Sequence, residues 1–91
     1  MLHYTFAENE IEITEKSAAQ DTTFTIAVKS EEMRTRLKQV RHFFEENKDY
    51  TDVLFYSRQD GTYEVIVRHD QKHAFLIHAF RCKCLTSLRW A

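Results

Sequence analysis

The chain contains one glycine and no proline in 91 residues, which restricts where its backbone can turn sharply. Glycine adopts positive φ angles without steric cost, and proline presets the φ of a turn. The glycine, Gly61, ends the polar stretch RQDG, which separates two segments rich in apolar residues, 50–57 and 62–68. This pattern predicts two strands joined in a β-hairpin. With so little glycine, the chain also has no glycine-rich loop of the kind that binds phosphate.

A two-residue loop and a four-residue loop would both place the same side chains of the two predicted strands on the same face of the hairpin. We assign the two faces on that basis. One face would carry Leu54, Tyr56, Tyr63, Val65 and Val67. We expect this face to point into the core, because it contains no charged residue. The opposite face would carry Val53, Phe55, Ser57, Glu64, Ile66 and Arg68.

Alternating apolar residues predict three further strands, over 2–7, 10–14 and 22–29. Ser30 follows the last of these strands and is a natural helix N-cap, because its hydroxyl can accept a backbone N–H of the first turn. Glu31 and Glu32 favour the same start, since the helix dipole stabilises negative charge in the first turn. One apolar stripe then predicts a helix over 31–47: Met33, Leu37, Val40 and Phe44.

A second helix is expected over about 70–83, with Asp70 as its N-cap. Its apolar stripe consists of Phe75, Leu76, Ala79 and Phe80. The alternative is a strand over 74–80, which is less well supported because the apolar residues there do not alternate with polar ones. Residues 84–90 do alternate, and they predict a closing strand.

From Thr22 onward, the expected order is strand, helix, strand, strand, helix, strand. This βαββαβ order resembles the ferredoxin-like fold, a two-layer sandwich in which two helices cover one face of an antiparallel sheet. The resemblance is architectural and implies an α+β class. We therefore expect a single domain over 1–91, with 22–91 as the βαββαβ body and 1–21 as an N-terminal β arm. The arm and the closing strand compete for the place beside 22–29, and the sequence leaves that strand order open.

Charge and hydropathy suggest a cytoplasmic protein that has no membrane partner. The net charge of −1 produces no overall field that would attract nucleic acid or a membrane. No apolar run reaches the roughly 20 residues of a membrane-spanning helix, and the first residues do not form a signal peptide. Two cysteines do not form the disulfide framework of a small secreted domain. The charge is uneven, because residues 1–21 carry five acids and one lysine, whereas 65–91 carry five Lys or Arg and one Asp.

Three histidines and both cysteines lie within residues 69–91, a grouping that raises the question of a metal site. On the expected helix, His78 and Cys82 are four residues apart and share a face, whereas His69 and His73 lie on the opposite side. Zinc needs three or four converging protein ligands. We therefore expect no metal and no cofactor, and a structural contact between His78 and Cys82.

The hairpin offers the best candidate for a functional surface. Val53, Phe55 and Ile66 would form an apolar triplet on the sheet face away from the helices, with Glu64 and Arg68 as its charged border. An exposed contiguous apolar surface usually marks a contact site. Together with the absence of any catalytic motif, it favours a non-catalytic interaction or regulatory module that forms a homodimer or binds another protein. The alternative is that the N-terminal arm covers the triplet.

Nucleic-acid binding is the second functional hypothesis. Arg34, Lys38 and Arg41 would form a basic row along the first helix, beside its apolar stripe. Such a row can contact the phosphates of RNA or DNA. A solvent-exposed helix flank would show the same pattern, so the basic row on its own does not separate the two readings.

Overall fold

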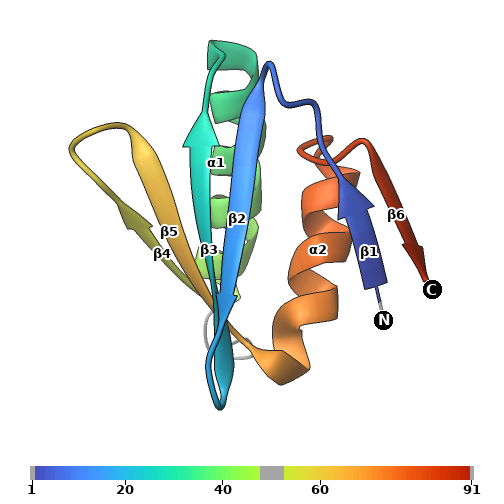
Figure 1. The fold of residues 1–91 in the computed structure, drawn as a ribbon. Helices are drawn as coiled ribbons and strands as arrows, with labels where there is room; N and C mark the ends of the chain where they lie inside the picture. The colour runs from blue at the N-terminus through green and yellow to red at the C-terminus, as the bar shows by residue number, and fades with distance from the viewer. Residues whose placement is uncertain (1, 48–52, 91) are drawn as a thin grey trace.

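A four-stranded antiparallel sheet forms the centre of the computed structural model, which describes residues 2–47 and 53–90 (Figure 1). Its strands are β2 (Ile11–Ser17), β3 (Asp21–Val28), β4 (Val53–Ser57) and β5 (Thr62–Arg68), in the order β2-β3-β5-β4. The central strands β3 and β5 alternate buried and partly buried residues along most of their length. This alternation is typical of strands with one face in the core.

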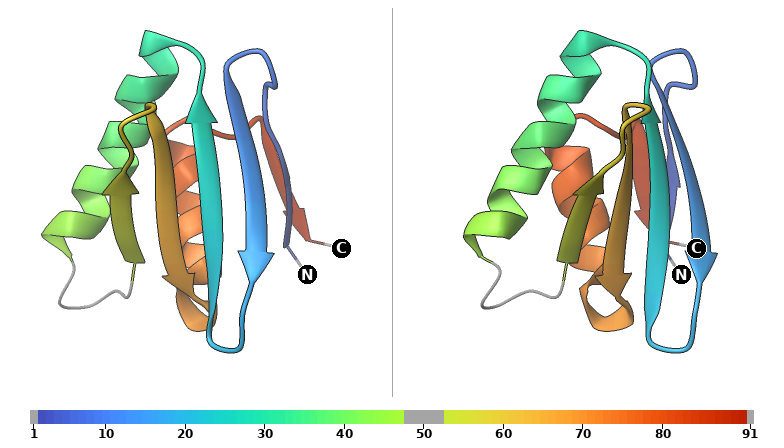
Figure 2. Two further views of the ribbon diagram at one scale, coloured as in Figure 1. Left: turned by 60° about the vertical axis from the view of Figure 1, so that its left-hand side comes forward. Right: turned by 90° about the vertical axis from the view of Figure 1, so that its left-hand side faces the viewer.

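Two helices cover one face of this sheet (Figure 2): α1 (Glu31–Glu46) and α2 (Lys72–Arg81), the latter preceded by the 3₁₀ turn η1 (His69–Gln71). The predicted N-cap of α1 is confirmed, because the Ser30 Oγ accepts the Met33 N–H at 3.1 Å. The predicted stripe is also confirmed, since all four of its members are buried. The cap of α2 was predicted wrongly: Asp70 lies in η1 and forms an ion pair with Arg68 at 3.8 Å.

The core lies between the helices and the sheet and is rich in aromatic rings. Phe75 of α2 lies at its centre, with ring centroids at 5.0 Å from Phe24, 6.0 Å from Phe44 and 6.2 Å from Phe55. These rings come from β3, α1, β4 and α2, so one cluster ties both helices to the sheet. Aromatic pairs at these separations stabilise a core beyond the area that they bury.

The strand order does not confirm the ferredoxin-like topology. The closing strand, β6 (Ser87–Trp90), pairs with β1 (Leu2–Thr5) in a separate two-stranded ribbon, and β2 occupies the edge beside β3. A short turn joins β2 to β3, and seven residue pairs follow from it. Such a local hairpin forms with a smaller loss of chain entropy than a pairing between distant segments. The described residues therefore form an α+β domain with two helices and two sheets.

The hairpin between β4 and β5 has a three-residue loop, and this overturns the predicted faces of β4. The Arg58 N–H donates to the Thr62 carbonyl at 2.9 Å, and the Gly61 N–H donates to the Arg58 carbonyl at 3.1 Å. Gly61 has a φ of +90°, so Gly61 and Thr62 together oppose Arg58 in a β-bulge. Relative to a two- or four-residue loop, the alignment shifts by one residue, and every β4 side chain changes face. The assignment for β5 is confirmed.

The remaining boundaries differ from the predictions by a few residues. The first three residues of the predicted strand 50–57 lie outside the described residues. In the closing segment only the last four residues form a strand, although Cys84 and Leu85 before it are buried. Within the described part of the chain, no helix is long and apolar enough to cross a membrane.

Candidate interaction surface

The structure does not bring the five predicted interface residues together. Val53 and Phe55 face the helices and are only 5% and 9% exposed, because the hairpin loop has three residues. They belong to the core, and their assignment to an exposed triplet was wrong. Ile66 and Glu64 lie half-buried on the open face of the sheet, and Arg68 lies exposed at the end of β5.

Leu54 and Tyr56 take the place that was assigned to Val53 and Phe55. Their side chains point away from the helices and are 53% and 51% exposed. In the register of the sheet, Leu54 lies opposite Ile66 and Tyr56 lies opposite Glu64. We call this surface the β4 border: the outer backbone edge of β4 together with Leu54, Tyr56 and Ile66. The period-two pattern of the sequence already places Leu54 and Tyr56 on one face of the strand, and only the loop length was needed to show that this face points outward.

The outer edge of β4 carries backbone groups that no other described strand pairs with, because β4 is the last strand of the sheet. The Arg58 N–H points to β5, since it donates to Thr62. Successive residues of a strand direct their N–H and C=O groups to opposite sides. By this alternation, three residues direct theirs away from β5: Val53, Phe55 and Ser57.

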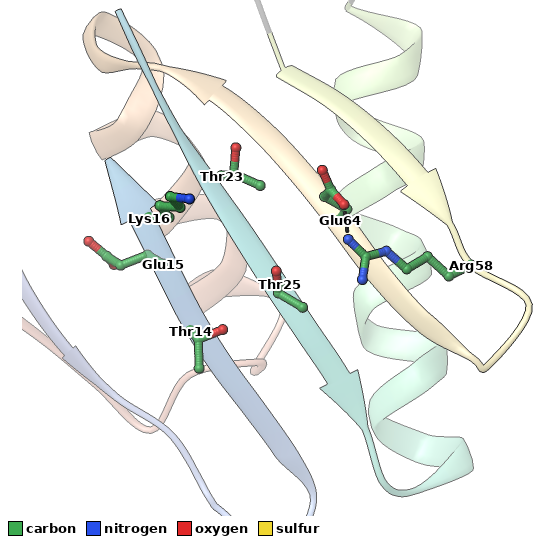
Figure 3. A pocket seen from close by; sticks show the side chains of 7 residues that line it. All are labelled: Thr14, Glu15, Lys16, Thr23, Thr25, Arg58 and Glu64. Atoms are coloured by element: carbon green, nitrogen blue, oxygen red, sulfur yellow. Dashed lines mark hydrogen bonds and ion pairs between the residues drawn. The ribbon is translucent and has the colours of Figure 1, made fainter. Parts of the chain in front are cut away.

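The rest of the open face is polar (Figure 3). A hollow of about 440 Å³ lies over β2, β3 and β5, and its lining consists of Thr14, Glu15, Lys16, Thr23, Thr25, Arg58 and Glu64. Figure 3 shows Arg58 reaching back from the hairpin loop to form an ion pair with Glu64. A surface of hydroxyl and charged groups stays hydrated at little cost. The large apolar side chains of the described open face therefore lie in the β4 border.

The predicted basic row lies along the hairpin, and contacts within the chain hold two of its three members. The Arg34 Nη1 donates to the Gly61 carbonyl at 3.3 Å, and its guanidinium carbon lies 5.8 Å from the centroid of the Tyr63 ring. The Arg41 Nη1 donates to the Ser57 Oγ at 2.8 Å, and its Nε lies 3.2 Å from a Glu45 carboxylate oxygen. Lys38, between them, is exposed. These arginines hold α1 to the hairpin.

The histidines and cysteines do not form a metal centre. No group of three or more His, Cys, Asp or Glu side chains suited to a metal exists among the residues described. The His78 ring stacks on Phe43 with centroids 3.9 Å apart, and burial lowers its pKa. Burial also raises the pKa of Cys82 and brings that of Cys84 to about 12, which favours the protonated thiol over the reactive thiolate at both positions.

Other exposed apolar side chains lie on the helical side of the molecule. Phe43 on α1, Ile77 and Phe80 on α2, and Trp90 on β6 are each at least 40% exposed. The Trp90 ring lies edge-on to His73, with centroids 4.9 Å apart. An open strand edge distinguishes the β4 border from the three side chains on the helices. Strand β6 also has an open edge, but its four residues, SLRW, include the charged Arg89, and charged side chains protect an edge from pairing. No protein-family model, curated protein or solved structure matches the chain, so no family is assigned to it.

Proposed function

We propose that this chain is a non-catalytic protein-interaction module that associates with itself through the β4 border. The observation that carries the proposal is the coincidence of an open strand edge with two half-exposed apolar side chains on the same strand. Edge strands are a ready template for pairing with another chain, and proteins that stay monomeric usually block them with Lys, Pro or a bulge. The sequence of β4, VLFYS, contains none of these residues and has high β propensity.

The opposite edge of the sheet is protected. Strand β2 has the sequence IEITEKS, and each of its last four residues carries a charged or hydroxyl side chain. The Tyr4 hydroxyl of the ribbon donates to a Glu15 carboxylate oxygen at 2.5 Å, and the Lys72 Nζ lies 3.1 Å from the other Glu15 oxygen. Ribbon and α2 are thus anchored beside β2. The contrast between the two edges supports β4 as the side that associates.

Charge and compartment fit this proposal. A net charge near zero leaves little repulsion between copies of the chain. Both cysteines are free thiols, which supports a reducing compartment such as the cytoplasm. RNA or DNA binding through Arg34, Lys38 and Arg41 has less support, since the two arginines already have partners within the chain.

Sedimentation velocity over a wide range of protein concentration tests the proposal. We expect a monomer–dimer equilibrium for the wild type and a dissociation constant raised by roughly tenfold or more in Leu54→Lys, because Lys blocks a strand edge. Ile77→Lys is the matched control: Ile77 is 45% exposed, on α2, and its substitution should leave the equilibrium unchanged. A wild type that stays monomeric throughout, or an equal effect of both variants, would contradict self-association through the β4 border.

A further inference from the structure

We infer that two copies join their β4 strands antiparallel, about a two-fold axis at Phe55, so that the two four-stranded sheets become one continuous sheet. The inference rests on the proposed function and specifies its partner, a second copy of this chain, and the pairing that the β4 border uses. The alternatives at the same border are stacking of one open sheet face on another and parallel pairing of the two edges.

The alternation of inward and outward backbone groups along β4 selects the register in which the two copies pair. Val53, Phe55 and Ser57 direct their backbone groups outward, and Phe55 is the middle residue of the strand. With the axis at Phe55, each outward residue faces an outward residue of the second copy: Phe55 faces Phe55, and Val53 faces Ser57. Every outward N–H and C=O between 53 and 57 then finds a partner. A shift by one residue would set outward groups against inward ones and leave them unpaired.

The side chains agree with this register. On the open face, Leu54 of each copy lies opposite Tyr56 of the other, which places a half-exposed aliphatic side chain against a half-exposed aromatic one twice. Cross-strand pairs of this kind stabilise antiparallel sheets. The strand has no charged residue between 53 and 57, so no like charges meet across the axis within it. The two patches are identical, as a closed two-fold dimer requires.

Disulfide trapping tests the register. Leu54→Cys and Tyr56→Cys are made separately in a Cys82→Ala, Cys84→Ala background, with different mass tags, and are mixed under mild oxidation. Opposite residues of an antiparallel pair have Cβ atoms about 4.5–5.5 Å apart, whereas diagonal residues are about 7–8 Å apart. Since a disulfide needs Cβ atoms about 3.5–4.5 Å apart, we expect the mixed 54–56 dimer to form at least roughly fivefold faster than either homodimer.

Two controls keep the result interpretable. Ile77→Cys, at a similarly exposed but remote position on α2, should cross-link no faster than chance collision allows. Cys84 is buried, so Cys84→Val replaces Cys84→Ala if the background melts at a lower temperature. A dimer in sedimentation without preferential 54–56 trapping would overturn this pairing while self-association stands. Preferential 54–54 or 56–56 products would indicate a different register or a stacking of the two open faces, and would also overturn it. A monomer in sedimentation would overturn both the pairing and the proposed function.

Discussion

Thr22 is a polar residue in an apolar environment. Its side chain points to the core face of β3, is 1% exposed, and its hydroxyl has no hydrogen-bond partner among the described residues. An unsatisfied buried hydroxyl costs free energy, because it loses its hydrogen bonds to water on folding. Thr22 thus lowers the stability of the fold at a position where an apolar residue of the same shape would fit.

We expect Thr22→Val to raise the free energy of unfolding by about 1 kcal/mol, since valine has the shape of threonine without the unsatisfied hydroxyl. Urea unfolding followed by circular dichroism measures the change. Thr23→Val is the control, because Thr23 lies on the open face and is only partly buried, and we expect a smaller change there. A loss of stability in Thr22→Val would show that the hydroxyl is hydrogen-bonded after all, for example to a buried water.

At the scale of elements, two turns in the described part of the chain depend on a positive φ, and only one of them has a glycine. Gly61 closes the hairpin at φ +90°, and Lys83 ends α2 at φ +67°. The Lys83 N–H donates to the Phe80 carbonyl and the Cys84 N–H to the Ala79 carbonyl, each at 2.9 Å. This is the Schellman motif, in which glycine is the usual residue at the left-handed position. In a chain with a single glycine, lysine occupies that position at a cost in backbone energy.

The two positions should respond in opposite directions to substitution. Gly61→Ala should lower the free energy of unfolding by about 1 kcal/mol, and Lys83→Gly should raise it by up to about 1 kcal/mol. Space is not the limit at Gly61, because an added Cβ would lie 3.6 Å from its nearest neighbour, the Arg34 Nη2. Urea unfolding of both variants measures the two changes. Equal effects of one sign would show that backbone strain does not determine the stability of these turns.

The same elements show what the sequence could predict. α1 was predicted to within one residue, because its cap and its apolar stripe are local signals that agree with each other. The hairpin was also predicted, but a hairpin loop fixes the parity of pairing, and RQDG fits loops of two, three or four residues. The candidate surface therefore lay on the right strands with the wrong side chains: Val53 and Phe55 in place of Leu54 and Tyr56. Lys83 could not be predicted at all, since lysine carries no signal for a left-handed residue.

At the scale of the whole molecule, the strand order was the main feature that sequence left open. Both β2 and β6 have strand-like alternation, and either could lie beside β3. The order is decided by connectivity: β2 reaches β3 through a short turn, whereas β6 lies about 60 residues from β3 along the chain and has β1 as a partner. Pairings between distant segments depend on the energy of the complete fold, which no local pattern in the sequence reports.

Two groups at the end of α2, the partly buried His78 and the buried Cys84, should set the pH range in which the molecule is most stable. Burial and, secondarily, the charge of Arg81 lower the pKa of His78, and burial raises the pKa of Cys84 to about 12. In the unfolded chain the pKa of the histidine is about 6.5 and that of the cysteine is about 8.5. Below about pH 6.5, His78 binds a proton more readily in the unfolded chain than in the folded one, so acid lowers the free energy of unfolding. Above about pH 8.5, Cys84 loses its proton more readily in the unfolded chain than in the folded one, so alkali lowers the free energy of unfolding as well. Stability should therefore fall on both sides of a plateau near pH 7 to 8.

Urea unfolding at a series of pH values measures this profile. We expect Cys84→Ala to make the alkaline limb shallower and to leave the acid limb in place. Some alkaline loss will remain, because the pKa values of Cys82 and Tyr4 are also raised in the folded state. An alkaline limb with the same slope in Cys84→Ala would show that other groups govern it.

The pairing of β1 with β6 determines how the molecule resists mechanical force. Leu2 lies opposite Trp90, so the two ends of the described chain leave the ribbon side by side (Figure 1). A load applied to Leu2 and Trp90 would pull the two strands apart at one end of the ribbon. The hydrogen bonds would then break one residue pair after another and would not share the load. Held between two optical traps, the molecule should release β1 and β6 in an early step at low force. The four-stranded sheet would stay folded until a second step at higher force, so the ribbon would be the mechanically weaker part of the molecule.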